Sequence, residues 1–406
     1  MNCRGCGADL SLTFLDLGVS PIANNLVEIQ NLSEEDVKYP LHVMTCQVCT
    51  LVQLSEVIPR ESLFPSNYTY FSSYSSSWLN HSKTYAEKMI SFLELNQTDL
   101  VVEIASNDGY LLQFFANSQI QVLGIEPAGG VAKAAIAKGI PTQIEYFGEL
   151  AGLELAKGKK PKLMIGNNVL AHVPDLHDFI KGFSILIHDE GLVTFEFPHL
   201  LNLIKNSQFD TVYHEHYSYL NISPLIPLFA QHGLKIVDVE KLLTHGGSLR
   251  IYVAKYSSNW VVHGSVQNII EEESKYDPRD KDIYSLIQNK TKEIKANLFS
   301  TLMKYKKEGK KISAYGAAAK GVTLLNYCNI STDLIDYVVD LNPKKQGRFI
   351  PGSRIPIVDL KMLDTNPPDI LLILPWNLTS EIKFQLSNYL NTGMKAIRAI
   401  PNLEHI

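Results

Sequence analysis

The segment Leu100-Val-Val-Glu-Ile-Ala-Ser-Asn-Asp-Gly109 has the pattern of a buried strand that ends in a tight polar turn. The helical pattern Tyr110-Leu-Leu-Gln-Phe-Phe115 follows it directly. Further apolar runs lie at 122–126, 163–166 and 191–196, and such nearly continuous runs are typical of parallel strands covered on both faces. This alternation predicts an α/β unit whose ligand site lies where the strands end.

The chain after this core indicates a second unit of the same class. Apolar runs at 234–239 and 248–253 flank Gly246-Gly247 and predict an antiparallel pair that ends the first sheet. Residues 259–308 carry many charges, which favours exposed helices that link two units. A new alternating pattern then predicts another α/β layer. Its strands are expected at 311–315, 335–340, 369–374 and 395–400.

Composition narrows the classes of partner. The chain has 406 residues, too many for one hydrophobic core, and its 45% apolar content excludes disorder. The 37 basic and 42 acidic residues form no long block of one sign, which argues against nucleic acid or a membrane surface as partner. The sequence shows no apolar run of membrane-spanning length and no apolar secretion signal at its start, so we expect a cytoplasmic protein.

Four cysteines form two pairs with metal-binding spacing. The pairs are Cys3-Arg-Gly-Cys6 and Cys46-Gln-Val-Cys49, and two such knuckles give a closed four-thiolate shell that suits structural zinc. The alternatives are reduced thiols or a redox pair. A redox pair normally opens a helix after a strand, and neither of these cysteine pairs does so. Residues 1–66 are short and interrupted by prolines, so zinc is expected to supply their missing core. Cys328 lies in an apolar stretch and is interpreted as a buried, inert thiol.

The first sheet predicts a cofactor that contains ribose. Glu126 ends the second strand, where a carboxylate can accept hydrogen bonds from ribose hydroxyls. The G-x-G-x-x-G spacing that cradles a pyrophosphate is absent, which favours S-adenosylmethionine over a dinucleotide. The alternative is a simple acidic strand end. The predicted cofactor residues are Glu103, Ala105, Asn107, Asp108, Gly109, Tyr110, Glu126, Pro127, Asn167 and Asn168.

The segment Phe209-Asp-Thr-Val-Tyr-His-Glu-His-Tyr217 holds the densest chemistry. In an extended chain His214 and His216 would share one side, whereas a helical turn would mix the sides. One hypothesis is a histidine or glutamate base beside donors for a developing oxyanion. A second is a metal site on His214 and His216, and a third is a polar surface loop. His172, beyond Asn167 and Asn168, is either structural or part of the same site.

With these motifs the sequence resembles the S-adenosylmethionine-dependent C-methyltransferases that act on nucleotide-linked ketodeoxysugars in antibiotic and surface-polysaccharide pathways. The resemblance covers nearly the whole chain. The shared features are the two cysteine knuckles, Val102-Glu-Ile-Ala-Ser-Asn-Asp-Gly109, Asn167-Asn-Val-Leu-Ala-His-Val173, Phe209-Asp-Thr-Val-Tyr-His-Glu-His216 and Ala314-Tyr-Gly-Ala-Ala-Ala-Lys-Gly321. Ala105 departs from the glycine usual in relatives, and its methyl group is expected to crowd the cofactor loop.

The resemblance implies an α/β fold of three domains. These are a zinc-binding domain at 1–66, a class I, Rossmann-like methyltransferase domain at 67–258, and a Rossmann-like α/β domain at 259–406 that helps to hold the sugar nucleotide. It implies transfer of a methyl group to C3 or C5 of a nucleotide-diphosphate 4-ketodeoxysugar through an enolate. The hypothesis that follows makes His216 the base, supported by Glu215.

The remaining site residues follow from the same family chemistry. Tyr213 and His172 are expected to donate to sugar oxygens, and Tyr68 and Tyr70 to close the pocket from the zinc-domain side. The late segment follows a strand and opens a helix, so its small residues and Lys320 predict a diphosphate site, while the alternative is close helix-to-sheet packing. The predicted sugar-nucleotide residues are Tyr315, Gly316, Ala317, Lys320 and Asn342.

Three other functions stay open at this point. The His-Glu-His segment could serve a zinc hydrolase with a second metal. The zinc module and the C-terminal unit could form a non-enzymatic, nucleotide-binding scaffold. An O-methyltransferase would bind the same donor, because donor binding does not specify the acceptor atom.

Overall fold

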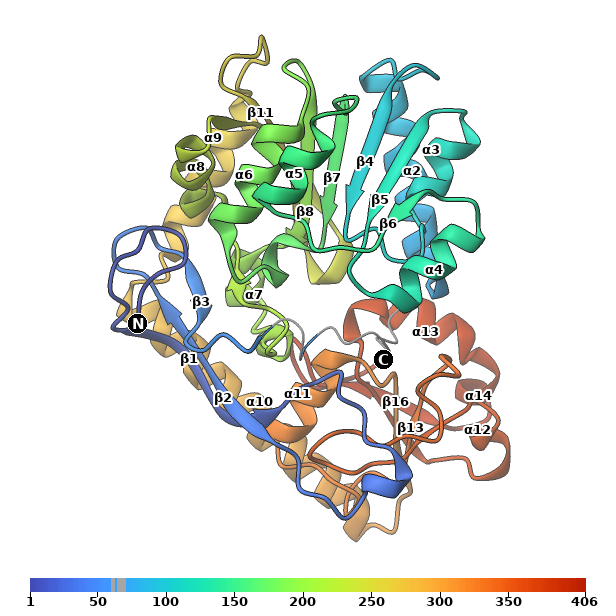
Figure 1. Cartoon of the computed structure of the whole chain (residues 1–406). Helices are drawn as coiled ribbons and strands as arrows, with labels where there is room; N and C mark the ends of the chain where they lie inside the picture. The colour runs from blue at the N-terminus through green and yellow to red at the C-terminus, as the bar shows by residue number, and fades with distance from the viewer. Residues whose placement is uncertain (60–62, 64–70) are drawn as a thin grey trace.

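The structure is a computed structural model that describes residues 1–59, 63 and 71–406. Figure 1 shows a small N-terminal sheet, a large central sheet between helices, and a C-terminal sheet. Tyr68 and Tyr70 lie outside the described residues, so their expected place at the pocket stays a prediction. None of the helices in the described ranges combines the length with the apolar character that a membrane crossing requires.

The central sheet contains the strands that the apolar runs predict. Within the described residues it has seven strands, in the spatial order β10 (Leu234–Leu242), β11 (Ser248–Lys255), β8 (Leu192–Pro198), β7 (Leu163–Asn167), β4 (Leu100–Ile104), β5 (Gln121–Ile125) and β6 (Thr142–Gln143). The strands from β8 to β6 are parallel. β10 and β11 form the predicted antiparallel pair, with β10 at the edge.

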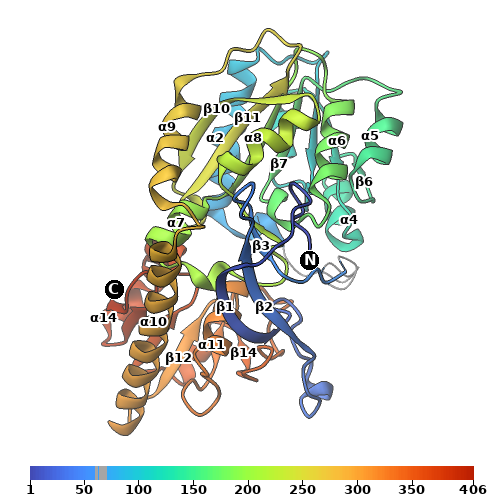
Figure 2. The same cartoon turned by 90° about the vertical axis from the view of Figure 1, so that its left-hand side faces the viewer.

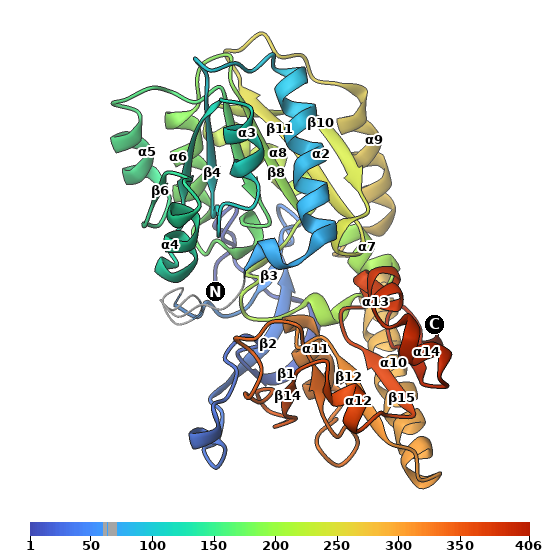
Figure 3. The same cartoon turned by 90° about the vertical axis from the view of Figure 1, so that its right-hand side faces the viewer.

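Helices cover both faces of this sheet. α2 (Ser76–Phe92) and α3 (Leu112–Asn117) pack on one face, as Figure 3 shows. The opposite face is covered by α5 (Glu149–Leu155), α6 (Leu176–Leu186), α8 (Ile222–Gln231) and α9 (Gly264–Glu273). Val101 packs in the first cluster and Val102 in the second, so alternate residues of one strand serve both faces. α4 (Gly129–Ala137) follows β5, and α7 (Leu200–Lys205) follows β8.

The N-terminal sheet borrows a strand from the central part of the chain. In the described ranges its antiparallel order is β1 (Leu12–Pro21), β2 (Lys38–Thr45), β3 (Val52–Leu54) and β9 (Ser218–Tyr219). The sheet also packs against α10 (Lys281–Lys307), which lies beside β1 and β2 in Figure 2. Phe14 and Leu15 are fully buried in this shared cluster. The sequence had suggested that zinc supplies the whole core of this module. That interpretation was incomplete, because the sheet also packs into a hydrophobic cluster that it shares with α10.

The C-terminal sheet confirms the second alternating pattern. Its order in the described part of the chain is β14 (Ile357–Val358), β13 (Val338–Val339), β12 (Ile312–Tyr315), β15 (Ile370–Ile373), β16 (Lys395–Arg398) and β17 (Glu404–His405). All but β17 pair in parallel. Its helices are α11 (Ala319–Tyr327), α12 (Met362–Thr365), α13 (Thr379–Gln385) and α14 (Ser387–Asn391).

The C-terminal sheet lies below the edge at which the central parallel strands end (Figure 1). Two observations fix this arrangement. Phe209 and Val212, which precede the His-Glu-His segment, pack in the same cluster as α11. The Thr323 hydroxyl of α11 donates to the Val212 carbonyl at 3.0 Å. The α/β units thus meet around the segment that sequence analysis marked as catalytic.

Candidate active site

The turn after β4 is built from residues in the left-handed region. Ala105, Asn107 and Gly109 have φ values of 57°, 49° and 76°. This turn brings the Asn107 N–H within 2.9 Å of the Glu126 carboxylate beyond β5, and the other oxygen of that carboxylate accepts the Ala128 N–H at 2.8 Å. Burial raises the pKa of Glu126 to about 6. Glu126 therefore joins the ends of two neighbouring strands at the predicted ribose position.

Ala105 shows why glycine suits this turn. A left-handed conformation costs an L residue about 1–2 kcal/mol, a cost that glycine avoids. The structure nevertheless accommodates the methyl group, because Ala105 packs against the apolar cluster that contains Ile104 and Ile125.

The predicted cofactor residues all lie near the carboxyl ends of β4, β5 and β7, which are adjacent strands. Oδ1 of Asp108, Asn167 and Asn168 is buried and has no hydrogen-bond partner among the described residues. Buried acceptors of this kind cost free energy unless a ligand or water satisfies them. S-adenosylmethionine carries amino and hydroxyl donors that match such acceptors. The residues present therefore fit this cofactor.

The start of α2 covers the cofactor turn. The Ser72 N–H, just before α2, donates to Oδ1 of Asn107 at 2.9 Å, and the Ser73 hydroxyl donates to Asp108. The Trp78 ring stacks at 6.0 Å on Tyr110, with 28° between the ring planes. The Trp78 ring therefore lies beside the predicted cofactor residues.

The His-Glu-His segment is a tight turn rather than an extended strand or a helix. The His216 N–H donates to the Tyr213 carbonyl at 2.9 Å, which closes the turn. The Tyr213 and His216 rings consequently share one side, with centroids 4.0 Å apart. The Tyr213 hydroxyl lies 2.9 Å from Nε2 of His216.

The hydrogen bonds of His216 define its tautomer. Nδ1 lies 2.8 Å from the Thr211 carbonyl oxygen, which can only accept, so Nδ1 carries the proton. In the neutral ring Nε2 is then the basic nitrogen, and it accepts from the Tyr213 hydroxyl. Burial lowers the pKa of His216 well below its usual value, and the neighbouring His172 lowers it further. The His216 imidazole is therefore neutral at physiological pH, with Nε2 unprotonated.

His172 joins this site, whereas His214 leaves it. The His172 ring centroid lies 4.6 Å from that of His216, and its Nδ1 donates to the Glu215 carbonyl at 2.6 Å. Burial lowers the pKa of His172 to about 4. His214 points to the N-terminal module, where Nε2 lies 3.3 Å from the Tyr39 carbonyl. His214 and His216 therefore do not converge on a metal, and the second-metal hypothesis loses its ligand pair.

Glu215 also faces the N-terminal module. Its Oε1 accepts hydrogen bonds from the backbone and side-chain nitrogens of Asn24, at 3.2 and 3.0 Å. Burial raises the pKa of Glu215. The group that holds Nδ1 of His216 is thus the Thr211 carbonyl, in the place where sequence analysis expected support from Glu215.

The predicted sugar-nucleotide residues surround the ends of β12 and β13. Asp340 accepts the N–H groups of Ala317 and Asn342, each at 2.8 Å, much as Glu126 ties the turn of the central sheet. Gly316 has a φ of 88°, and an added Cβ would lie 2.5 Å from Pro375. Tyr315 is buried and its hydroxyl donates to Gln385, so its side chain packs within the C-terminal part.

Lys320 has contacts that differ from those of the rest of that set. Its Nζ donates to Oδ1 of Asn377 at 2.7 Å and lies 4.7 Å from the centre of the Trp376 ring. The Trp376 indole N–H donates to Oδ2 of Asp210 at 2.7 Å. Asp210 belongs to the short 3₁₀ turn Phe209–Thr211 that leads into the His-Glu-His turn.

Sequence analysis missed several residues that the fold brings to this region. His245, with a φ of 53°, lies 3.2 Å from Nδ2 of Asn168, and its ring centroid is 5.2 Å from that of Trp78. Asp210 and Trp376 join the two α/β units. The available signal was His245 directly before Gly246-Gly247, which was interpreted only as a hairpin turn.

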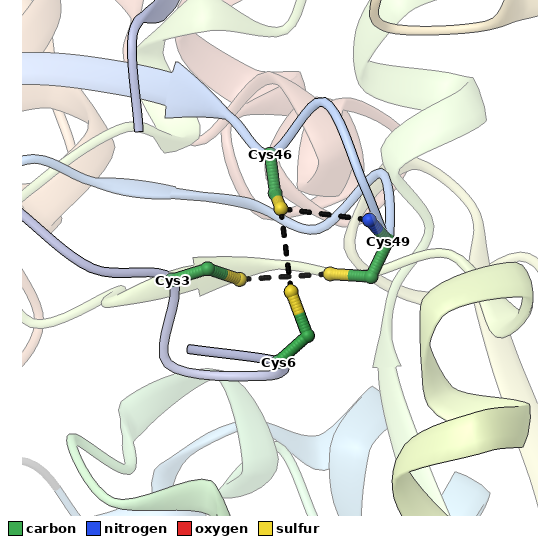
Figure 4. Close-up of side chains that lie close together, drawn as sticks. All are labelled: Cys3, Cys6, Cys46 and Cys49. Atoms are coloured by element: carbon green, nitrogen blue, oxygen red, sulfur yellow. Dashed lines mark hydrogen bonds between the residues drawn. The ribbon is translucent and has the colours of Figure 1, made fainter. Parts of the chain in front are cut away.

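The four paired cysteines converge as predicted (Figure 4). Their sulfur atoms all lie within 4.8 Å of one another, and the pairs Cys3–Cys49 and Cys6–Cys46 are each 3.5 Å apart. Tetrahedral zinc with thiolate bonds of about 2.3 Å requires sulfur separations of about 3.8 Å. The donor set and its spacing therefore fit structural zinc.

The zinc knuckle is joined through Gln53 and Arg4 to the residues that follow the His-Glu-His turn. Gln53 of β3 donates from Nε2 to the Cys3 sulfur at 3.1 Å and accepts the Arg4 N–H at 3.0 Å. The Arg4 guanidinium donates to the carbonyls of Leu54 and Tyr217. Gln53 also pairs with Ser218 across β3 and β9. The strand that follows the His-Glu-His turn is thereby fixed to the metal site.

The site and fold together define an S-adenosylmethionine-dependent methyltransferase with a four-cysteine zinc site. Three family models match the chain: a zinc binding domain at residues 3–64, a methyltransferase domain at 78–239, and a C-methyltransferase C-terminal domain at 243–401. The chain is 33% identical over 400 residues to the C-methyltransferase NovU of Streptomyces niveus, covering 98% of this chain and 95% of that protein. It belongs to this C-methyltransferase family.

Solved structures of methyltransferases also match part of the chain. A magnesium protoporphyrin IX methyltransferase from Synechocystis PCC 6803 with bound S-adenosylmethionine is 15% identical, with a TM-score of 0.33, over 44% of this chain and 81% of that one. An S-adenosylmethionine-dependent methyltransferase from Clostridium acetobutylicum is 10% identical, with a TM-score of 0.35, over 44% of this chain and 92% of that one.

Proposed function

We propose that the enzyme methylates the carbon beside the ketone, C3 or C5, of a nucleotide-diphosphate 4-keto-deoxysugar, through an enolate, in deoxysugar biosynthesis. The observation that carries this proposal is the state of His216, a neutral imidazole with Nδ1–H on Thr211 and Nε2 beside the Tyr213 hydroxyl. This pair supports removal of a proton from carbon. C-methylation beside a ketone requires that step.

The acidity of the substrate explains why His216 needs partners. The α-carbon of a ketone and an imidazolium differ by on the order of a dozen pKa units, roughly 16 kcal/mol. Donors to the developing oxyanion must supply much of this difference. We assign that role to Tyr213, whose ring adjoins that of His216. His172 also adjoins His216, but its Nδ1 proton is given to the Glu215 carbonyl, so its Nε2 faces the site as an acceptor rather than as the predicted donor. S-adenosylmethionine, when bound, supplies an electrophilic methyl group, which the site must hold about 3–3.5 Å from the enolate carbon.

The cofactor is proposed to lie across the ends of β4, β5 and β7. In this arrangement Glu126 accepts hydrogen bonds from the ribose hydroxyls, and Asn167 and Asn168 bind the amino-acid tail or the adenine. Their positions on adjacent strands and their unpartnered, buried oxygens support this assignment.

The sugar nucleotide is proposed to lie between the two α/β units, with its nucleotide on the C-terminal part near Gly316, Ala317 and Asn342. Tyr68 and Tyr70 would close the pocket from the zinc-domain side. The burial of Tyr315 within the C-terminal part favours a supporting position for that residue.

The function is tested with purified enzyme, labelled S-adenosylmethionine and a panel of 4-ketosugar nucleotides that differ in base and sugar. Mass spectrometry and NMR then locate the new methyl group. We expect a carbon-bound methyl next to the ketone of at least one substrate. A methyl group on oxygen, or no transfer to any ketosugar nucleotide, would reject the proposal.

The base is tested separately by exchange of the α-hydrogen with deuterated water in the presence of S-adenosylhomocysteine. We expect His216→Asn to lose this exchange, because the variant lacks the imidazole Nε2 that lies beside the Tyr213 hydroxyl. His214→Asn is the matched control, since His214 faces Tyr39. Exchange by His216→Asn at the rate of the unchanged enzyme would show that another group is the base.

A further inference from the structure

The ammonium group of Lys320 lies between the two α/β units. Lys320 is in the first turn of α11, yet its side chain leans on the Trp376 ring and donates to Asn377. Trp376 in turn binds the Asp210 carboxylate through its indole N–H. Because Asp210 and Thr211 share one 3₁₀ turn, and Thr211 holds the His216 ring, the chain of contacts leads from Lys320 to the proposed base.

The charged and titratable groups that face Lys320 come from both units. Burial lowers the pKa of Lys320, and the acidic Asp210 opposes that effect. The positive charge of Lys320 contributes, after burial, to the lowered pKa values of His216 and His245. Lys320 has no ion pair within 4.0 Å in the described part of the chain. It is thus a half-buried cation without an ion-pair partner in that part of the chain, and its charge acts on the neutral imidazoles of His216 and His245.

The diphosphate of a sugar nucleotide has other cations available. Lys345 donates to the Ala317 carbonyl at 2.8 Å and lies 3.7 Å from the Asp340 carboxylate. The exposed Lys344 lies 4.2 Å from the centre of the Phe71 ring. Both follow β13, and Lys345 borders the loop Gly316-Ala317, where a diphosphate would approach. The side chain of Lys320 instead contacts Trp376 and Asn377, and Trp376 binds the Asp210 carboxylate.

We propose that Lys320 donates a hydrogen bond to the enolate oxygen of the substrate rather than to its diphosphate. This inference rests on the proposed function and assigns a catalytic group to the same site. A cation in a water-poor cleft stabilises a developing oxyanion more strongly than a neutral donor does. Tyr213 is a neutral donor, and the Nε2 of neutral His172 carries no proton because Nδ1 donates to Glu215. Lys320 therefore adds the positive charge that balances the negative charge of the enolate.

The step balances as follows. Nε2 of His216 takes the α-proton, the C–H electron pair becomes the C=C bond, and the carbonyl π pair moves to oxygen, where the Lys320 ammonium donates. The carbonyl then re-forms as the enolate carbon bonds the methyl group, and the electron pair of the broken C–S bond stays on sulfur. The His216 imidazolium finally loses its proton to water.

The test compares Lys320→Met with two other lysine variants. Each is assayed for α-hydrogen exchange with S-adenosylhomocysteine present, for kcat and KM of methyl transfer, and for affinity toward deoxythymidine diphosphate and uridine diphosphate. We expect Lys320→Met to slow exchange and kcat about 10²–10³-fold, with KM and diphosphate affinity within about threefold of the unchanged enzyme. Lys345→Met should instead weaken nucleoside diphosphate binding. Lys306→Met is the charge-matched control and should change none of these values. Lys306 lies on α10, and its ammonium pairs with the Asp336 carboxylate at 2.7 Å.

Two results would overturn the inference. One is exchange at the unchanged rate in Lys320→Met, and the other is a loss of diphosphate affinity without slower exchange. Lys320→Arg and Lys320→Gln keep the inference testable if the methionine variant does not fold. Arginine keeps the positive charge and the stacking on Trp376, so Lys320→Arg should retain more α-hydrogen exchange than Lys320→Gln. If the unchanged enzyme methylates no ketosugar nucleotide, the proposed function itself fails. If it does and only the lysine result differs, the function stands without this role for Lys320.

Discussion

The Tyr213 hydroxyl and Nε2 of His216 lie 2.9 Å apart within one tight turn, with the two rings in contact. The phenol donates to the only ring nitrogen of His216 that lacks a proton, because Nδ1 is committed to Thr211. The proposed base and the proposed oxyanion donor thus come from the two ends of one four-residue turn.

Replacing Tyr213 with Phe should separate these roles. Loss of a donor to the oxyanion is expected to lower kcat about 10²–10³-fold. The phenol also stabilises neutral His216, so its removal should raise the pKa of that ring and move the acid limb of the rate profile to higher pH. Steady-state kinetics across pH measures both effects. An unchanged kcat would remove Tyr213 from the oxyanion role.

The pH dependence of exchange follows from the burial of His216. Burial holds its pKa well below the usual value of about 6.5, so the base stays neutral as the pH falls through 6.5. We therefore expect α-hydrogen exchange to persist at pH 6 and to fall only in more acidic solution. A midpoint at or above 6.5 would contradict this assignment. A thermal melt at each pH shows whether the fold survives.

Removal of zinc should disturb the active site as well as the N-terminal module. The Cys3 sulfur is bound by Gln53, which pairs with Ser218 just after the His-Glu-His turn. We expect one zinc per chain by elemental analysis, and faster amide hydrogen exchange in residues 213–219 after chelation. Cys46→Ser should reproduce the effect. Cys328→Ser, which changes a buried thiol outside the cluster, should keep the metal.

Glu126→Gln should weaken binding of S-adenosylhomocysteine. Losing a charged acceptor of the ribose hydroxyls is expected to reduce affinity about tenfold to a hundredfold. Calorimetric titration measures the change directly. Glu149→Gln, which alters an acid paired with Lys181 on α5 and α6, should bind normally. Equal affinities of Glu126→Gln and the unchanged protein would remove Glu126 from the ribose site.

Gly316→Ala should destabilise the C-terminal part. Gly316 has a φ of 88°, and a new Cβ would lie 2.5 Å from the Pro375 ring, so we expect a loss of about 2–4 kcal/mol in the free energy of unfolding. Gly309→Ala is the matched control. It has a similar φ of 73° but nothing within 4 Å of the new atom, so about 1–2 kcal/mol is expected. Denaturant unfolding compares them, and equal losses would exclude the Pro375 clash.

Local pattern was enough to predict the main strands of the two α/β sheets and the zinc ligands, but it did not predict the N-terminal sheet. The parallel strands are recognisable in the sequence as apolar runs, because each strand buries both of its faces. The zinc ligands are recognisable because each pair of cysteines has a short, fixed spacing. The turn at Asn107 and the acid at Glu126 were also found this way, since both follow from where a strand ends.

Side-chain direction could not be predicted in the same way. Glu215 and His216 are neighbours in sequence, but one binds Asn24 in the N-terminal module and the other Thr211 in its own segment. The turn at Tyr213 that separates them depends on packing by α11 and β9. Lys320, Asp210 and His245 meet across units that are far apart in sequence, so no local spacing marks their association.

The pairing of β3 with β9 has a consequence for recombination among relatives. An exchange of the first sixty residues alone would leave Ser218 and Tyr219 facing a foreign edge, with Arg4 no longer matched to Tyr217. A viable chimaera would have to transplant the 217–219 strip together with the metal module. We therefore expect these two distant stretches to be exchanged together, both in natural recombination and in engineered chimaeras.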